Sequence, residues 1–372
     1  MLIAVGAALV AAIAAAILYG LMRDWIVEPK LLKADARELK STVVSPHLEE
    51  QIVPGKNVLW CSTFQLAWNE GCRNAGGDIR LDVEPPMVPI LNKKTAQESD
   101  LAPDSYVVMF GPFDASTVGK IRQELERKFQ GQASPDLFNT IEREVATKGG
   151  PGSCLAYAYL FRNLPFEYRF ERLKKPFVFS STQVASFGLS MQTPQWDELA
   201  GQVSVLDYKS DADFILALTP REKGEHILLA KIAPAETVEK TISMIRKRVV
   251  ESSAKEEPSG LSPNEPLVIP ILNFDLRREY VELEGERITT PGPLKALPIF
   301  WALQSIRFRL DDRGAVLKSE SVLAAKSAPL EMPPKPRQFI FDKPFLILLE
   351  RTDAAQPYFA LWVDNAELLA PY

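Results

Sequence analysis

Few residues of this sequence have the type and spacing that catalysis requires. The segment Ser252–Lys255 matches S-x-x-K, the pattern of acyl-transfer enzymes in which a lysine assists a serine. Its neighbours Glu256 and Glu257 make it part of a polar linker, where no pocket could desolvate the lysine. His47 and His226 have no nucleophile in their sequence context, so a Ser-His-Asp site is not expected. We therefore expect a protein that is not an enzyme.

Metal, redox and nucleic-acid chemistry are not expected either. Two histidines leave little for a metal site. Cys61, Cys72 and Cys154 form an odd set at wide spacing, which fits neither a disulfide framework nor a metal cluster. We predict that the three cysteines are buried as small apolar residues. The net charge of −5 disfavours nucleic acid, because an acidic chain repels phosphates. No cofactor is expected.

The N-terminus has the composition of a membrane anchor. Leu2–Met22 contains no charged residue and would be roughly 30 Å long as a helix, the thickness of a bilayer core. Tyr19 and Trp25 lie near one end, where amphipathic rings favour the headgroup region. The alternative is a secretory signal peptide, but the run exceeds a signal core of roughly 7–15 residues and no basic residue precedes it. We predict a single-pass anchor over residues 1–23.

Residues 24–53 have mixed charge and no evident core, so we predict a polar stalk that ends where the domain begins at Pro54. Basic residues follow the span and favour a cytoplasmic domain by the positive-inside rule, without fixing the side: Arg23, Lys30, Lys33, Arg37 and Lys40.

Residues 54–372 show the elements of one α+β domain. A strand at Val58–Cys61 precedes a helix for which Ser62 and Gln65 would form a capping box. Further helices are expected over about 115–129, 135–146 and 235–250. Further strands are expected at Tyr106–Phe110, Cys154–Phe161, Val203–Leu206, Phe214–Leu218, Leu267–Phe274, Phe345–Leu349 and Tyr358–Val363.

The last 70 residues contain a strand that enters a segment with no clear end. Ile306, Phe308 and Leu310 alternate with charged residues, a pattern typical of a half-buried strand. An acidic pair and Gly314 follow, and residues 324–338 are small, basic and rich in proline.

This order of parts resembles the serpins, a superfamily of serine protease inhibitors. Leu310–Ala315 is similar to the strand end and hinge that precede a serpin's exposed reactive loop. Phe339–Leu346 resembles the Phe-x-x-(Asn/Asp)-x-Pro-Phe motif that opens the closing hairpin. Asn57–Ser62, Ala158–Asn163 and Gln202–Pro220 resemble earlier family segments, so the resemblance covers roughly residues 54–369. It implies a large mixed β-sheet with additional sheets and surrounding helices.

The resemblance also implies where function would lie. A serpin inhibits when its reactive loop is cut and inserts into the main sheet as a new strand, which releases stored strain. Gly314, Ala315, Leu317 and Ser319 would form the hinge, where Leu317 is larger than the alanine of inhibitors and the family's threonine is missing. The cleaved bond would fall at Ala328–Pro329, which few proteases cut. Lys326–Ser327 is a better trypsin-like bond but lies two residues early.

Three functions remain open from the sequence. The preferred one is a membrane-tethered serpin-like protein that binds a protease or another membrane-proximal protein through residues 314–338, which look degenerate for inhibition. The second is an active serine protease inhibitor. The third is a purely structural envelope protein that uses the fold without a moving loop.

Overall fold

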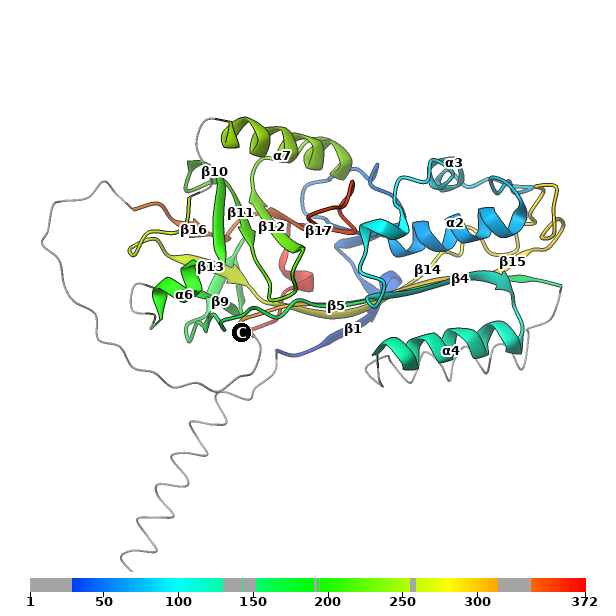
Figure 1. Cartoon of the computed structure of the whole chain (residues 1–372), viewed down its shortest axis with the longest axis horizontal. Helices are drawn as coiled ribbons and strands as arrows, with labels where there is room; N and C mark the ends of the chain where they lie inside the picture. The colour runs from blue at the N-terminus through cyan, green and yellow to red at the C-terminus, as the bar shows by residue number, and fades with distance from the viewer. Residues whose placement is uncertain are drawn as a thin grey trace, which may run out of the picture. The chain divides into compact units, whose positions relative to one another are not determined.

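The computed structural model describes residues 29–129, 143, 152–190, 193, 195–254, 259–313 and 336–372, and Leu31–Tyr372 forms one compact unit. That unit is a mixed α+β fold with several sheets and few helices (Figure 1). The predicted span Leu2–Met22 lies outside the described residues. Within the described ranges, no helix combines the length and the apolar composition needed to cross a bilayer.

The longest strands form sheet A, which has five strands in the order β1-β14-β15-β5-β4 among the described residues. β15 and β5 run parallel, as do β1 and β14, whereas β14 is antiparallel to β15 and β4 is antiparallel to β5. The strands are β1 (Leu32–Asp35), β4 (Tyr106–Pro112), β5 (Cys154–Asn163), β14 (Leu272–Glu279) and β15 (Ile299–Leu310).

Sheet B packs against sheet A, and the main core lies between them. Its order is β10-β11-β12-β17-β18-β3-β2. Its strands are β2 (Thr42–Ser45), β3 (Asn57–Cys61), β10 (Val203–Ser210), β11 (Asp213–Leu218), β12 (Glu225–Lys231), β17 (Phe345–Arg351) and β18 (Phe359–Val363). The remaining strands form sheet C and a hairpin: β16 (Phe339–Ile340), β13 (Leu267–Pro270), β9 (Ser186–Leu189) and β6 (Glu171–Arg172), then β7 (Phe177–Phe179) with β8 (Thr182–Val184).

The helices cover the sheets. Helices α2 (Thr63–Ala75) and α4 (Ala115–Phe129) lie on opposite faces of sheet A, and α7 (Val238–Ser253) covers the outer face of sheet B (Figure 1). The shorter helices are α3 (Met87–Leu91), α6 (Trp196–Ala200), η1 (Ala36–Glu38), η2 (Glu98–Asp100) and η3 (Ala366–Leu368). The helices predicted over about 63–75, 115–129 and 235–250 are present, although α7 begins later than expected and extends into the predicted linker. Of the helix predicted over about 135–146, only residue 143 lies within the described residues.

The predicted capping box at the start of α2 is wrong. Ser62 has helical backbone angles and makes no hydrogen bond that caps the helix. The side chain of Gln65 is buried and donates to Asn69 Oδ1 at 2.8 Å and to the Leu91 carbonyl at 2.6 Å. The S-x-x-Q pattern does not form a cap here because the helix starts inside the core, where the buried Gln65 side chain bonds to Asn69 and to Leu91 instead of to the backbone of Ser62.

The half-buried strand predicted near the C-terminus is confirmed as the end of β15. Ile306, Phe308 and Leu310 are at most 2% exposed and belong to the core between sheets A and B. Arg307 and Arg309 alternate with them on the other face and are partly exposed. The period of two therefore predicted both the strand and its buried face.

The predicted stalk is wrong over residues 31–53, which belong to the compact unit. β1 pairs with β14 at the edge of sheet A, and β2 pairs with β3 at the edge of sheet B. Val44 and Leu48 are buried in the core clusters. The polar composition of this segment conceals both strands, because each is a short edge strand with few apolar positions.

Candidate functional site

The predicted loop residues lie outside the described residues. This applies to every hinge and cleavage-site candidate: Gly314, Ala315, Leu317, Ser319, Lys326, Ser327, Ala328 and Pro329. The structure does describe both ends of the segment, up to Arg313 and from Pro336 onward. The candidate site therefore has three parts. The first is the hinge, the described residues 311–313 after β15. The second is the line along which β5 and β15 pair in sheet A, which we call the β5–β15 seam. The third is the set of contacts that hold residues 336–345.

The hinge begins with a fully buried carboxylate that two arginines hold. Asp312 is 0% exposed and follows β15 by two residues. Arg169 donates to its Oδ2 from Nε at 2.8 Å and from Nη2 at 2.5 Å. Arg172 approaches Oδ1 with Nε at 2.8 Å and Nη2 at 2.6 Å. Charge-assisted contacts of this kind are the stronger class of hydrogen bond, so the hinge is firmly held.

The neighbouring carboxylate is held by its own strand. Asp311 is 4% exposed and accepts from Arg309 Nε at 2.8 Å and from the Arg313 amide at 3.0 Å. The Arg309 Nη2 atom lies 2.6 Å from the same carboxylate. We call Asp311, Asp312 and the arginines that contact them the hinge clamp.

Aromatic packing places the arginines of the hinge clamp. Phe166 and Phe170 are buried, and their rings meet edge to face with centroids 4.8 Å apart. Because Arg169 lies between β5 and β6 and Arg172 ends β6, this packing holds both beside the end of β15. The charged heads stay near the surface, with 37% and 25% of their side chains exposed.

A second buried ion pair anchors the chain where it re-enters the described part. Arg337 donates to both oxygens of Glu265, at 2.6 and 2.9 Å, and its guanidinium lies over the rings of Tyr208 and Phe339. Burial raises the pKa of Glu265, but the hydrogen bonds from Arg337 and from the Ser262 amide outweigh it, so the pKa is lowered.

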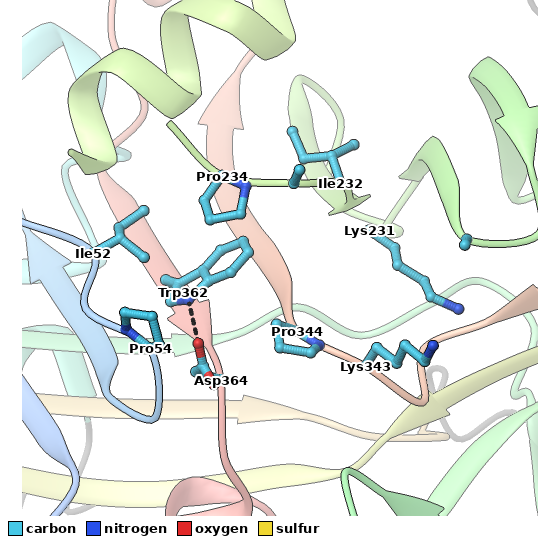
Figure 2. Close-up of a pocket in the computed structure, with 11 residues that line it drawn as sticks. Ile52, Pro54, Lys231, Ile232, Pro234, Lys343, Pro344, Trp362 and Asp364 are labelled. Atoms are coloured by element: carbon cyan, nitrogen blue, oxygen red, sulfur yellow. Dashed lines mark hydrogen bonds between the residues drawn. The ribbon is translucent and has the colours of Figure 1, made fainter. Parts of the chain in front are cut away.

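A buried lysine fixes the start of the closing hairpin. Lys231 Nζ donates to the Ile340 carbonyl at 2.7 Å and to Asp342 Oδ1 at 2.6 Å. Lys231 and Lys343 line a cleft of about 340 Å³ together with Trp362 and Pro234. Figure 2 shows the two lysines on one side and Trp362 and Pro234 on the other. Because Lys231 ends β12, the serpin-like motif is held to sheet B.

The β5–β15 seam joins the two halves of sheet A directly. Its register runs from Ile299 opposite Cys154 to Arg309 opposite Asn163. A strand that turned back after the hinge would run antiparallel to β15, and therefore also antiparallel to β5. On the other side of β15 the same strand would lie parallel to β14, because β14 and β15 are antiparallel. The seam is thus the position where a returning strand would be antiparallel to both neighbours.

A buried polar network connects β15, at the seam, to the end of β3 and the start of α2. Gln304 of β15 is 0% exposed and donates to the Cys61 carbonyl at 3.1 Å and to Thr63 Oγ1 at 2.9 Å. Tyr280 donates to Gln304 Oε1 at 2.7 Å, and burial raises its pKa, so the phenol remains a donor. The seam is therefore tied to the first residue of α2.

The other sequence candidates have plain structural roles. Cys61, Cys72 and Cys154 are buried free thiols, as predicted, and burial raises the pKa of each. Ser252 and Ser253 belong to the end of α7, and Lys255 lies outside the described residues. Across the part of the chain that the structure covers, no cluster of His, Cys, Asp and Glu could hold a metal ion.

The order of elements follows the serpin expectation. β3 leads into α2, β5 lies inside sheet A, β15 enters the hinge, and β17 and β18 close the chain. No family model matches the sequence, and no curated protein matches it.

Several solved structures match the chain, among them the following three. Protease nexin-1, crystallised with heparin, is 14% identical over 68% of this chain, with a TM-score of 0.41. Mouse protein-Z dependent protease inhibitor is 14% identical over 68%, with a TM-score of 0.43. A tumour suppressing serpin is 9% identical over 83% of this chain and 92% of its own, with a TM-score of 0.47.

The chain spans less than two thirds of the first two structures, 65% and 64% of their lengths. With identities of 9–14% and TM-scores below 0.5, these likenesses carry no conclusion about the activity or partners of this chain.

Sequence reasoning found the acidic pair but missed the residues that hold it. Arg169 and Arg172 lie about 140 positions earlier, and nothing in the sequence links them to Asp312. Arg337 and Gln304 were missed for the same reason. The sequence could have indicated only that a buried carboxylate after β15 needs a cationic partner, without saying which residue supplies it.

Proposed function

We propose that this protein is a membrane-tethered, serpin-like protein that acts by binding another protein and does not inhibit proteases by loop insertion. The observation that carries the proposal is the hinge clamp. Asp312 is fully buried and is held by the partly exposed Arg169 and Arg172, so moving the hinge would take a buried carboxylate away from its cationic partners. Breaking a fully buried pair costs about 3–5 kcal/mol, and because both arginines are partly exposed we place the cost here at the lower end, about 3 kcal/mol.

The loop sequence supports the same proposal. Leu317 stands where inhibitors favour alanine, and Ala315 follows Gly314 in place of the threonine of the family. A larger side chain at an inward position would have to enter a sheet whose inner face is already packed, which costs roughly 1–3 kcal/mol. The partner would be a protease or another membrane-proximal protein that binds residues 314–338.

The tether part of the proposal rests on the sequence of Leu2–Met22. Because the compact unit starts at Leu31, only residues 23–30 would separate the span from the fold. Eight extended residues reach at most about 28 Å. The domain would then stay close to the bilayer surface, nearer than a stalk ending at residue 53 would allow.

A second candidate function is active protease inhibition, and the seam favours it. β5 and β15 pair directly, and a strand returning from the hinge would be antiparallel to both of them. Cleavage at Lys326–Ser327 or Ala328–Pro329 could then drive insertion. The hinge clamp opposes this reaction, so binding without inhibition remains the preferred proposal.

Incubation with proteases separates the two candidates. The full chain is mixed with a trypsin-like and an elastase-like protease, and SDS-stable complexes are sought by gel electrophoresis. Binding without inhibition predicts cleaved or intact chain but no SDS-stable complex. A covalent complex with either protease would refute the preferred proposal and establish the inhibitor.

A further inference from the structure

The chain enters sheet A at the same end of the sheet as the hinge. β1 runs parallel to β14, and β14 runs antiparallel to β15, so β1 starts where β15 finishes. Leu32 is opposite Phe274, and Phe274 is opposite Phe308 of β15. Two spacings between neighbouring strands therefore put Leu32 about 10 Å from Phe308. The chain that precedes Leu32 thus joins the compact unit beside the hinge.

Cations gather on one face of sheet A at this end. Leu303 of β15 packs beneath α4, and the period of two puts Arg307 and Arg309 on the same face. Lys33 of β1 also lies there, because Lys33 is opposite Asp275 and Asp275 is opposite Arg307. The arginines of the hinge clamp adjoin this row. We call the whole set the basic face: Lys33, Arg169, Arg172, Arg307, Arg309 and Arg313.

The carboxylates of the hinge clamp lie beneath these cations. The side chains of Asp311 and Asp312 are 3% and 0% exposed. Those of Arg169 and Arg313 are 37% and 27% exposed, and Lys33 is exposed. With the carboxylate opposite Lys33, the basic face has six cations against three carboxylates. A partner that approached this face would therefore meet positive charge, although the whole chain has a net charge of −5.

The other acids of the segment that contains Arg169 have partners of their own. Glu171 accepts from Thr193 Oγ1 at 2.7 Å and from Ser190 Oγ at 3.2 Å. Glu167 lies 3.8 Å from Arg221, which adds a further cation. These acids therefore do not cancel the charge of the basic face.

A positive face beside the point of attachment suits an anionic bilayer surface. Basic residues near such a surface each strengthen binding about fivefold, over a range set by a Debye length of about 8 Å. Because the compact unit starts at Leu31, residues 23–30 would hold the face within about 28 Å of the predicted span, close enough for contact. An acidic protein would match the same charge. The bilayer is favoured because the predicted tether itself keeps it near this face.

We infer that the basic face docks on the anionic lipid head groups of the bilayer that holds residues 2–22. The inference rests on the proposed function in taking those residues as the tether. Docking turns the hinge towards the lipid, so the chain after Arg313 starts at the bilayer surface. A protein that binds there would then belong to the same membrane.

Quenching by lipids with a nitroxide on the head group tests the docking in the full chain. The native cysteines are buried, so one introduced cysteine can be labelled with a fluorophore. Tyr168→Cys places the label next to Arg169, at a residue that is 44% exposed. Val250→Cys places it on α7, which lies on the opposite side of the compact unit from α4 (Figure 1). In nanodiscs of phosphatidylcholine with phosphatidylserine we expect quenching at 168 and little at 250, and in phosphatidylcholine alone little at either.

Charge variants then test whether the basic face makes the contact. Lys33→Gln with Arg313→Gln removes two of its cations and should lower the docking equilibrium roughly twenty- to thirtyfold, at about fivefold per charge. The matched control, Lys240→Gln with Lys247→Gln, removes the same charge from exposed positions of α7 and should leave quenching at 168 unchanged. Raising the salt to about 1 M shortens the Debye length to about 3 Å and should abolish the quenching without any variant.

Several results would overturn the inference. They are quenching at 168 that does not need phosphatidylserine, that survives high salt, or that falls equally in the α7 control. Absence of quenching at 168 in phosphatidylserine nanodiscs would also overturn it, and would leave the basic face to an acidic protein.

A failure of the proposed function is seen separately. If phosphatidylcholine nanodiscs do not retain the full chain, the tether is wrong. Flotation of the full chain with phosphatidylserine vesicles then measures the same contact, and the Lys33 and Arg313 pair should reduce it whereas the α7 pair should not. An SDS-stable complex with a protease would count against binding without inhibition and would leave the docking unaffected.

Discussion

The substitution Asp312→Asn tests the hinge clamp with little change in side-chain volume. Asp312 is 0% exposed, and its two carboxylate oxygens are each held by one arginine, Arg169 or Arg172. Asparagine removes the negative charge and leaves two cations facing each other. Removing one partner of a buried ion pair costs about 3–5 kcal/mol. Because the arginine side chains are 37% and 25% exposed, water can partly compensate, and we expect about 3 kcal/mol.

Urea unfolding of the full chain measures this loss as a shift of the midpoint at unchanged slope. The matched control is Asp353→Asn, which breaks a 3.2 Å ion pair with Arg351 where the aspartate is 71% exposed. Such an exposed pair contributes less than about 1 kcal/mol. The double variant Asp312→Asn with Arg172→Gln should lose less than the sum of the single losses, because both remove the same pair. Equal losses for Asp312→Asn and Asp353→Asn would refute the hinge clamp.

Two further predictions concern Glu265 and α2. Because the pKa of Glu265 is lower in the folded state, its ion pair stabilises the fold above the unfolded pKa, and this stability is lost as pH falls through the folded pKa. Arg337→Met should therefore reduce the loss of stability on acidification below about pH 4.5. An unchanged dependence of stability on pH in urea titrations would count against this. Gly71→Ala should cost about 1–3 kcal/mol because the new methyl group meets the Phe110 ring, whereas Gly119→Ala in α4 meets no atom within 4 Å and should stabilise by up to about 1 kcal/mol. Thermal melts of the two variants that shift in the same direction would contradict the packing of α2 on sheet A.

The parts of the fold that the sequence predicted have a regular pattern over enough residues. β15 alternates apolar and charged residues, and α4 repeats apolar residues at helical spacing, so both the element and its buried face could be predicted. The serpin-like motif at Phe339–Leu346 predicted the closing hairpin of β17 and β18, because the motif residues are local in sequence.

The parts that the sequence did not predict depend on long-range contacts. β1 and β2 have four residues each, too few to show a period, and their partners are distant strands. The contacts of Glu367 with residues 40–42 cross more than 320 positions. The hinge clamp likewise joins Asp312 to a segment about 140 positions away. In each case the sequence contains the charged residue, and only the fold provides its partner.

The most direct test of a protein that binds without inserting its loop is the melting temperature before and after cleavage within residues 324–330. The full chain is cut with a protease, the cut is verified by mass spectrometry, and both forms are melted under the same conditions. Our account predicts that cleavage leaves the melting temperature unchanged, because the hinge clamp stays closed and sheet A gains no strand. A large rise in the melting temperature on cleavage would show that the loop inserts, and it would contradict the account.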